Sequence, residues 1–531
     1  MLREPRNYAR MSSRYLLKRL PGQMLLTIAP DPALQVANDY GKVALRQRIR
    51  SLTGRRRPEE LPGYAALARS APMKVALVFP RETNMATVPN LGLGYLSAVV
   101  SREGFENRIY HCAKEKLDPD GLAASLLEFK PDVVGLQSYS FFHNKARRAA
   151  AVIKSSLPDT KIVIGGPHAS GLPRSVLSEE PAFDFGFSGE AEIGFPALLR
   201  LLAGDRTDKR TIPGLIWRDG GTINANPQQS VKDLDSLPFP AWDKMDVKRY
   251  PHHAHGVFAP GFPVVPMAYS RGCNYNCSYC AARTISGPGV RYRSPENMIK
   301  EIEYVYCELG VKVASFVDQN LTANREAAMR LCDGLIKSGF NLKWYCPNGV
   351  YLDSLDDELL EKMSAAGCES IAVGIESASS GSLKSLGRKA PDLKDVREKL
   401  LLIKKRGIGV TGNFMLGLPG EDEKDFRNTF SAALKLPLDR AQFAFFAPFP
   451  GTRFFLELFP DSTADWDDFN VIAPNFIAAP LRNKARLLMI AAFLFFYARP
   501  AVFWRNLREI RSARHAAFVL SKIINIAKIL K

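Results

Sequence analysis

The chain contains 531 residues, of which 46% are hydrophobic and 24% are charged. This composition excludes a wholly disordered, collagen-like or polytopic membrane chain, and at about 150 residues per domain the length predicts three or four folding units. The net charge of +18 is confined to the two ends, because residues 1–70 carry +9, residues 481–531 carry +10 and the rest sum to −1. We therefore expect no nucleic-acid groove through the body, whereas the ends could contact an anionic surface.

Cysteine usage and the start of the chain indicate the compartment. Eight cysteines are too few for a disulfide scaffold in a chain of this length. No apolar signal peptide opens the sequence, although its arginine-rich start is also compatible with an organellar transit peptide. We expect a cytoplasmic protein.

A basic extension, residues 1–71, precedes the first predicted domain, residues 72–205. Short apolar runs alternate there with helical stretches such as Leu91–Glu103 and Asn144–Ser156. The predicted strands are Lys74–Phe79, Asp132–Leu136, Lys161–Ile164 and Phe183–Phe187. This alternation is typical of an α/β domain with a doubly wound parallel sheet. Residues 206–262 are rich in Pro, Asp, Gly and Asn and are predicted to be a linker.

A second alternation of strands and helices fills residues 263–460. The six predicted strands are Val264–Ser270, Ala314–Val317, Lys343–Cys346, Ser370–Gly374, Gly409–Leu416 and Ala441–Phe446. Six strand-helix units are too few for a closed eight-stranded barrel, so we expect a partial barrel with an open side.

The last segment, residues 461–531, is predicted to be a basic, amphipathic, helical tail. Its apolar run Leu487–Ala498 has 12 residues, well short of the roughly 20 needed to span a bilayer. After it, Arg505, Arg508, Arg511 and Arg514 recur at three-residue spacing among Phe503, Trp504, Leu507, Ile510 and Phe518. This spacing favours a helix lying on a surface, while packing on the barrel with a solvated charged face is the alternative.

Three cysteines lie close together directly after the first barrel strand. Cys273, Cys277 and Cys280 have the spacing CxxxCxxC, and three thiolates on one loop can converge on an iron-sulfur cluster. A zinc site would require a fourth nearby Cys or His, and the next cysteine is Cys307. Three ligands to a four-iron cluster leave one iron open.

This loop resembles that of the radical S-adenosylmethionine (SAM) superfamily, in which an aromatic residue, here Tyr279, precedes the third cysteine. The resemblance implies a 4Fe-4S cluster held by the three cysteines, with SAM bound at the open iron and cleaved by one electron from a donor such as flavodoxin or ferredoxin. Further strand ends resemble the superfamily's SAM-binding positions. The implied contacts are Tyr279, Asp318, Gln319, Glu376, Ser377 and Gly417.

The first domain resembles the cobalamin-binding domain that is often fused ahead of such barrels. Its predicted cofactor contacts are Gly92, Gln137, Ser138, Gly165, Gly166, His168 and Glu190. The motif Asp-x-His-x-x-Gly, which supplies a histidine beneath cobalt in many cobalamin proteins, is absent after Phe79. The resemblance therefore implies a cobalamin without a protein histidine on cobalt, and a Rossmann-like cap that binds no corrin is the alternative. Of His168 itself we expect a role as a loop residue or a contact with the cofactor's tail, rather than a bond to cobalt.

Together the two resemblances imply a cobalamin-dependent radical SAM enzyme. The expected reaction is methylation of an unactivated carbon, or of phosphorus, in a small-molecule or lipid-like biosynthetic intermediate. A radical cyclase or oxidoreductase without methyl transfer is the alternative. A methylthiotransferase is disfavoured because such relatives carry a further N-terminal three-cysteine cluster, and residues 1–260 hold only Cys112. If the tail lies on a membrane, we expect peripheral contact at the inner face and a membrane-associated substrate.

Overall fold

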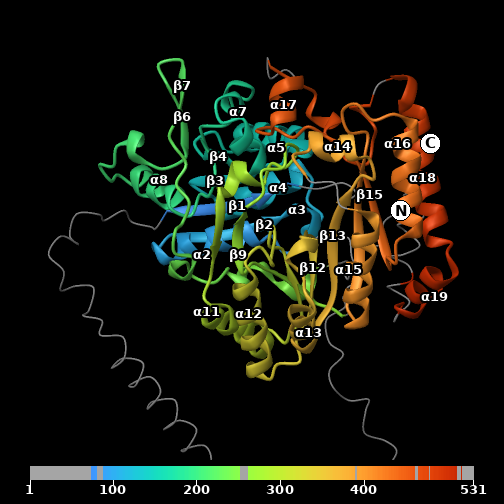
Figure 1. Ribbon diagram of the computed structural model, residues 1–531. Coiled ribbons are helices and arrows are strands. Elements are labelled where there is room, and N and C mark those ends of the chain that lie inside the picture. Colours follow the sequence, from blue (N-terminus) through green and yellow to red (C-terminus); the bar gives the residue numbers. More distant parts are fainter. Residues whose placement is uncertain are drawn as a thin grey trace, which may run out of the picture. The chain divides into compact units, whose positions relative to one another are not determined.

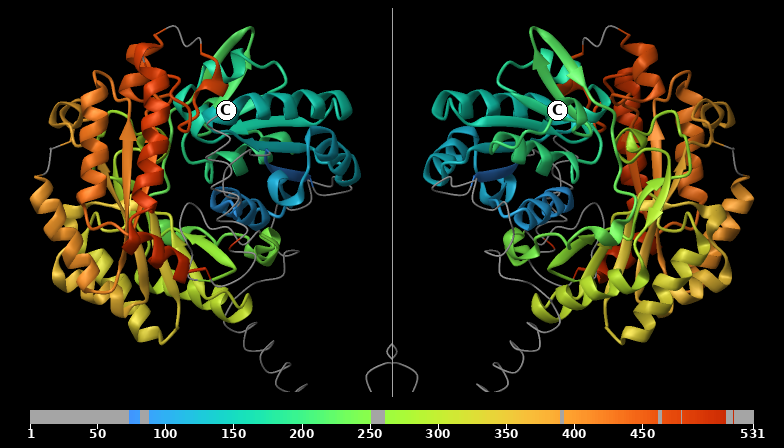
Figure 2. Two further views of the ribbon diagram at one scale, coloured as in Figure 1. Left: turned by 90° about the vertical axis from the view of Figure 1, so that its right-hand side faces the viewer. Right: turned by 90° about the vertical axis from the view of Figure 1, so that its left-hand side faces the viewer.

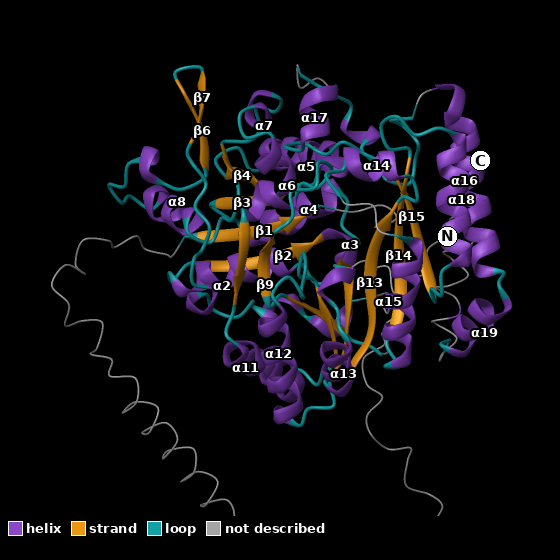
Figure 3. Ribbon diagram, viewed as in Figure 1, coloured by secondary structure: helices purple, strands orange, loops and turns teal. Residues whose placement is uncertain are grey.

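The computed structural model describes residues 73–80, 88–250, 261–388, 392–460, 464–477, 479–510 and 516. Residues Ala71–Lys531 form one compact unit that contains two main β-sheets, with helices on the faces of each (Figures 1 and 3).

The first sheet has seven strands in the order β2-β1-β3-β4-β5-β6-β7. The first five strands in the chain are parallel and the last two are antiparallel. The strands are β1 (Lys74–Phe79), β2 (Glu106–His111), β3 (Val133–Gln137), β4 (Lys161–Gly165), β5 (Phe185–Phe187), β6 (Leu215–Asp219) and β7 (Thr222–Ala225). The helices between them are α2 (Leu91–Arg102), α3 (Cys112–Glu115), α4 (Pro119–Phe129), α5 (His143–Ser156), α6 (Pro167–Gly171), α7 (Ser175–Ser178) and α8 (Gly194–Leu202).

Two apolar clusters, one on each face, confirm the doubly wound prediction. Leu126 of α4 and Ile153 of α5 belong to one cluster, whereas Val100 of α2 and Leu198 of α8 belong to the other. Alternate strand residues point to opposite faces, so one strand can contribute to both clusters. Ala76 and Leu77 of β1 divide in this way.

Three strands of this sheet were not predicted. β2 carries polar residues at most positions because it is an edge strand. β6 and β7 lie inside the predicted linker, residues 206–262, where they are joined by Gly220 and Gly221, both with positive φ. Two such glycines allow the tight turn of a β-hairpin, so this part of the linker extends the sheet.

The second sheet confirms the six-stranded partial barrel. Its parallel strands have the order β15-β14-β13-β12-β11-β8, and β8 and β15 are its two edges. They are β8 (Val264–Met267), β11 (Val313–Phe316), β12 (Lys343–Val350), β13 (Cys368–Glu376), β14 (Gly409–Leu416) and β15 (Arg440–Phe445). The main helices between them are α11 (Pro295–Glu303), α12 (Arg325–Ser338), α13 (Asp357–Ala365), α14 (Ser380–Ser385), α15 (Leu393–Lys405) and α16 (Glu423–Lys435).

Side chains that cap the helix N-termini help to define where these helices begin. Each capping oxygen accepts a hydrogen bond from a backbone N–H of the first turn, which otherwise has no partner in the helix. The barrel caps are Ser294, Asn324, Asp356, Ser379, Asp392 and Asp422.

The first barrel strand is shorter than the predicted Val264–Ser270. It ends at Met267, and a separate strand β9 (Ser270–Cys273) pairs with β10 (Gly289–Tyr292) in a two-stranded antiparallel sheet. The cause is the Asp318 carboxylate, which accepts hydrogen bonds from the backbone N–H groups of Tyr269 and Ser270 and from the Ser270 hydroxyl. These bonds take the chain out of the barrel sheet just before the cysteines.

The C-terminal part contains α17 (Arg453–Leu458), α18 (Ala479–Tyr497) and α19 (Pro500–Arg508). α18 packs along α16 and β15 (Figure 2) and buries Ala485, Met489 and Phe496. Among the described helices, none is long and apolar enough to cross a membrane alone. The pair Leu481–Tyr497 and Pro500–Arg508, bent by 73°, has the length and composition of a membrane span only when the two helices are taken together. Arg511, Arg514 and Phe518 of the predicted amphipathic tail lie outside the described residues.

Candidate functional site

The three-cysteine loop is held at its base by the β9-β10 hairpin. Cys273 is the last residue of β9 and lies opposite Gly289, while α10 (Ala282–Ser286) follows Cys280. Gly272 has φ +100°, and a Cβ there would lie far inside the contact distance of the Gly289 carbonyl oxygen. Only glycine therefore allows the two strands to approach at the point where the loop begins.

The three thiols lie close enough to influence one another electrostatically. Burial, with Cys280 and Cys273 as further causes, raises the pKa of Cys277 to about 11, and burial also raises the pKa of Cys280. Iron binds the thiolate, so cluster assembly on this loop would release protons. Three sulfur donors on one anchored loop fit the predicted 4Fe-4S cluster.

Tyr279 joins this loop to the carboxyl end of β13. Its hydroxyl donates to Glu376 Oε1 at 3.0 Å, and Arg388 Nη1 donates to the same oxygen at 2.7 Å. Glu376 has φ +62° although it is not glycine, and such strain is common where a side chain must be aimed at a ligand. Burial raises the pKa of Glu376, and the Arg388 guanidinium opposes that rise.

Asp318 and Gln319 follow β11 and differ in whether a side-chain oxygen is left without a hydrogen-bond partner. Both oxygens of Asp318 hold the start of β9, and burial raises the pKa of this carboxyl to about 6. Gln319 donates to Ser286 Oγ at 3.2 Å, but its buried Oε1 has no hydrogen-bond partner among the described residues. The unpartnered acceptor on Gln319 fits an amino-group donor such as that of SAM, while the expected contact of Asp318 with SAM stays a prediction.

Ser377 and Gly417 meet through Glu421, which the sequence analysis did not identify. Ser377 Oγ donates to Glu421 Oε1 at 2.8 Å, and the N–H groups of Gly417 and Leu418 donate to Oε2 at 3.0 and 3.1 Å. A Cβ on Gly417 would lie 2.5 Å from Ile477, so the turn after β14 packs closely there. Glu421 is thus a positioning residue for two predicted SAM contacts.

The inner face of β14 also carries polar groups that the sequence analysis did not single out. Val410, Phe414 and Leu416 point into the outer core, so Thr411 and Asn413 point to the opposite face. Thr411 Oγ1 and Asn413 Oδ1 are buried and have no partner among the described residues. Both side chains thus lie on the face of β14 away from the outer core.

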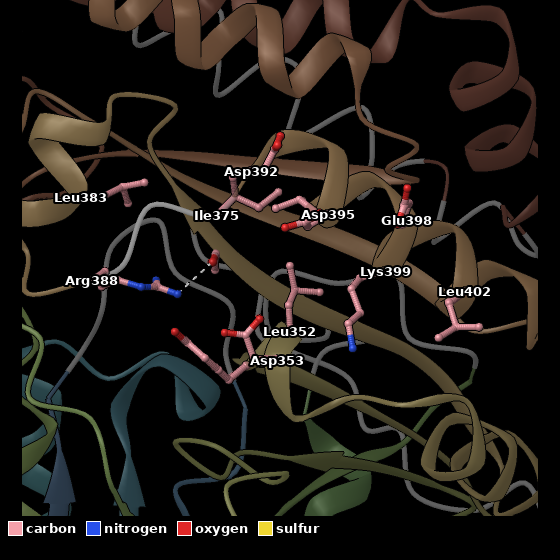
Figure 4. A pocket seen from close by; sticks show the side chains of 13 residues that line it. Leu352, Asp353, Ile375, Leu383, Arg388, Asp392, Asp395, Glu398, Lys399 and Leu402 are labelled. Carbon is pink, nitrogen blue, oxygen red and sulfur yellow. Dashed lines mark hydrogen bonds between the residues drawn. The ribbon is translucent and has the colours of Figure 1, made fainter.

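A pocket of about 580 Å³ lies beside Glu376, between β13, α15 and the turn after β12. Arg388 enters it and donates to the carbonyl oxygen of Gly374 at 3.2 Å (Figure 4). Its other polar side chains are Tyr351, Asp353, Asp392, Asp395, Glu398 and Lys399. None of the three cysteines lines this pocket, so it is distinct from the cluster loop.

The predicted cobalamin contacts Gly92, Gln137 and Gly165 lie at the carboxyl edge of the first sheet. Gln137 ends β3 and is paired with Gly165 at the end of β4, while Asn90, which caps α2, donates to Gln137 Oε1. A Cβ on Gly165 would meet no atom within 4 Å. The backbone there is open to an approaching ligand, and ligands of open α/β sheets bind at this edge.

The other predicted cobalamin contacts already have partners inside the protein. Gly166, with φ +97°, packs so closely on the Ser138 backbone that a Cβ would lie 2.8 Å from its carbonyl oxygen. The Ser138 hydroxyl lies 2.9 Å from Nδ1 of His143. His168 is fully buried, and its ring packs on those of His143 and Trp466. Contact of Ser138 and His168 with a corrin stays a prediction that this packing does not favour.

Glu190, whose contact with cobalamin stays a prediction, joins the first domain to the cluster hairpin. Arg291 of β10 donates to its two oxygens at 3.0 and 2.6 Å, and Val231 N–H donates at 2.9 Å. Arg271 of β9 pairs with Glu192 at 2.8 Å and with Glu190 at 3.6 Å. We call Glu190, Glu192, Arg271 and Arg291 the carboxylate clamp. It fixes the strand that ends in Cys273 against the loop after β5.

Comparison with known families assigns both regions. Residues 267–433 match the radical SAM superfamily, and residues 83–199 match the B12 binding domain. The matched regions contain the three-cysteine loop and the carboxyl edge of the first sheet, respectively.

Curated relatives cover most of the chain at low identity. An uncharacterized methyltransferase of Pyrococcus horikoshii is 28% identical over 85% of this chain and 97% of its own. The anaerobic magnesium-protoporphyrin IX monomethyl ester cyclase of Cereibacter sphaeroides is 27% identical over 79% of this chain and 69% of its own. The hopanoid C-3 methylase of Methylococcus capsulatus is 26% identical over 72% of each chain.

A solved structure supports the fold. The cobalamin-dependent SAM radical enzyme OxsB, with aqua-cobalamin and SAM bound, superposes with a TM-score of 0.66 over 86% of this chain and 71% of its own, at 16% identity. The order of a doubly wound domain followed by an open barrel is therefore shared with this enzyme.

Proposed function

Because this chain belongs to the cobalamin-dependent radical SAM enzymes, we propose that it transfers a methyl group to an unactivated carbon of an apolar, membrane-associated intermediate. The observation that carries this proposal is the carboxylate clamp. Arg271 lies two residues before Cys273, and its partners Glu190 and Glu192 follow β5 of the sheet that would bind cobalamin. One substrate held between these elements could be reached by both cofactors.

In this proposal the cluster and SAM supply a radical that removes hydrogen, cobalamin supplies a methyl group from a second SAM, and flavodoxin or ferredoxin supplies electrons. The chain orients and shields these groups. Tyr279, Gln319 and Glu376 would hold SAM over the cluster loop. Thr411 and Asn413 would orient the substrate on the inner face of β14, where water is excluded.

Isotope transfer tests the proposal. Anaerobically reconstituted protein, a reductant and SAM with a deuterated methyl group should be incubated with a lipid extract of the source cells. Label should appear on the bound corrin and in one lipid product. S-adenosylhomocysteine and 5′-deoxyadenosine should form in equal amounts, since one SAM molecule supplies the methyl group and a second supplies the radical. The Cys273→Ala variant should give neither labelled product nor 5′-deoxyadenosine. A lipid product that carries no label would overturn the methyl-transfer proposal.

A radical cyclase or oxidoreductase is the second candidate, favoured by the similarity to the protoporphyrin ester cyclase. Such a reaction consumes SAM as a radical source only. It would therefore give 5′-deoxyadenosine without S-adenosylhomocysteine, in the same incubation.

The membrane part of the proposal rests on the outer side of α18 and α19. Leu487, Leu494, Phe495, Phe503, Trp504 and Leu507 are 44–64% exposed, and we call them the apolar face. They follow helical spacing, while the opposite side of α18 packs in the barrel core. Because residues 481–531 also carry +10, the face fits an anionic lipid surface, where each basic residue contributes about 1 kcal/mol.

Sedimentation with vesicles tests this surface in the full-length protein. Replacing Leu494, Phe495 and Trp504 together by Ser should lower binding to phosphatidylglycerol vesicles more than tenfold, about 1.4 kcal/mol or more, and binding by the parent should weaken as salt rises. Leu456→Ser with Leu458→Ser on α17 is the matched control, because these side chains are 64% and 51% exposed. Equal binding by the parent and the triple variant would contradict the assignment.

A further inference from the structure

Two histidines and a glutamate meet inside the first domain, away from the cysteine loop. His143 begins α5 after β3, His168 lies in α6 after β4, and Glu179 follows α7. Both histidines are fully buried. One ring nitrogen of each histidine and one oxygen of Glu179 lie within 4.8 Å of one another. Neither the B12-binding nor the radical SAM chemistry described above requires this group.

Hydrogen bonds leave one nitrogen of each ring without a partner. His143 Nδ1 lies 2.9 Å from Ser138 Oγ, and His168 Nδ1 lies 3.1 Å from Ser140 Oγ. Because the Ser138 hydroxyl donates to the Tyr139 carbonyl at 3.4 Å, its oxygen is free to accept from His143 Nδ1–H. That arrangement leaves a lone pair on His143 Nε2. The Nε2 atoms of both histidines are buried and have no partner among the described residues.

Two unpartnered nitrogens side by side are unfavourable in a protein core, since buried polar groups nearly always have partners. The rings are stacked, with centroids 3.8 Å apart and planes inclined by 22°, and stacking satisfies neither lone pair. Both rings are fully buried, and burial disfavours the charged imidazolium. Neutral imidazole is the form that binds a metal ion.

We propose that His143 Nε2, His168 Nε2 and the Glu179 carboxylate bind a divalent transition-metal ion such as Zn²⁺, with a fourth position for water. Two histidines and one glutamate are an established ligand set for zinc. Metal-ligand distances of about 2.0–2.2 Å place two ligand atoms of one ion no more than about 4.3 Å apart. The three ligand atoms here lie within 4.8 Å of one another. Binding of the ion therefore requires these atoms to move closer, with the two rings turning out of their stack. The serine hydroxyls on Nδ1 are the outer partners that orient metal-binding histidines elsewhere.

The Glu179 carboxylate is oriented from the C-terminal part of the chain. Trp466 Nε1–H donates to Glu179 Oε2 at 2.9 Å, and the Trp466 ring packs edge-on against His168, with centroids 4.5 Å apart. The ion would thus fix the loops that directly follow Gln137 of β3 and Gly165 of β4 against the segment that follows α17. Its role is structural, it does not depend on the methyl-transfer proposal, and its loss should also weaken binding of cobalamin at this edge.

Metal analysis of the full chain tests the site. The parent should be the Cys273→Ala, Cys277→Ala, Cys280→Ala variant, so that zinc cannot occupy the cluster thiolates. After loading with Zn²⁺ and dialysis, we expect about one zinc ion per chain. His143→Gln, His168→Gln or Glu179→Gln should each lower this content at least about tenfold. His111→Gln, at the buried histidine that ends β2, and Glu180→Gln are matched controls that should retain the metal.

Two further readouts separate loss of metal from loss of fold. Zn²⁺ should raise the Tm of the parent and of both controls but not of the three site variants, because only a native site binds the ion. X-ray absorption of the zinc-loaded parent should show nitrogen and oxygen ligands without sulfur. A parent that takes up no zinc, or zinc that remains in the His143→Gln and His168→Gln variants, would overturn the proposal.

Discussion

Replacing Cys273, Cys277 or Cys280 by Ala should abolish reductive cleavage of SAM. Each change removes one of three thiolates on a loop whose ends are fixed by β9 and α10, and two protein thiolates do not hold a four-iron cluster in the position that presents a single open iron to SAM. We expect the rate of 5′-deoxyadenosine formation to fall at least about a thousandfold, which corresponds to about 4 kcal/mol. Iron content and this rate, measured on the same anaerobic preparation, check the prediction.

Cys307→Ala is the matched control for these variants. Cys307 is an exposed free cysteine in the irregular turn that continues α11, so its removal should leave iron content and SAM cleavage unchanged. A variant of the three-cysteine loop that keeps both four irons and 5′-deoxyadenosine formation would show that the cluster is bound elsewhere.

Gly272→Ala should disrupt the same loop without removing a ligand. Alanine at φ +100° costs about 1–2 kcal/mol in backbone strain, and its methyl group would also collide with the Gly289 carbonyl oxygen. Overpacking of this kind adds about 1–3 kcal/mol. The hairpin must separate at Cys273, so we expect a large loss of iron on reconstitution and a lower Tm.

Gly289→Ala is the control that introduces backbone strain without a steric collision. Gly289 also has positive φ, +82°, but a Cβ there would meet no atom within 4 Å. This variant should lose only the strain energy and should bind iron like the parent. Equal iron contents in the Gly272→Ala and Gly289→Ala proteins would contradict the idea that close approach of β9 and β10 forms the loop.

The sequence predicted the parallel strands well because they are buried on both faces and appear as continuous apolar runs. It failed where a strand is polar or where its end depends on a distant side chain. β2 is an edge strand with alternating exposure, and β6 and β7 are short strands in a segment rich in turn residues. The first barrel strand ends at Met267 because Asp318, 48 residues after Ser270, takes the next N–H groups. Local patterns carry no information about that bond.

The predicted site residues divide in the same way. Motifs point to the cysteines, Tyr279 and Glu376 because these residues have a recognisable spacing or follow a predicted strand, and their cofactor roles stay predictions. Glu421 and Arg388 escaped notice, since their roles follow from contacts with Ser377, Gly417 and Glu376 that only the fold creates. Glu190 lies in a glycine-rich motif, and its ion pair with Arg291 in the carboxylate clamp depends on the fold and not on that motif.

The carboxylate clamp limits how the first domain of this chain can be exchanged for another. A first domain grafted from another protein would bring its own residues opposite Arg271 and Arg291, and without two carboxylates there it would leave two guanidinium groups, less than a fifth exposed, without an anionic partner. A buried charge without its partner costs about 3–5 kcal/mol. Working chimeras should therefore exchange residues 190 and 192 together with the hairpin of β9 and β10, as one cassette that crosses the boundary between the domains.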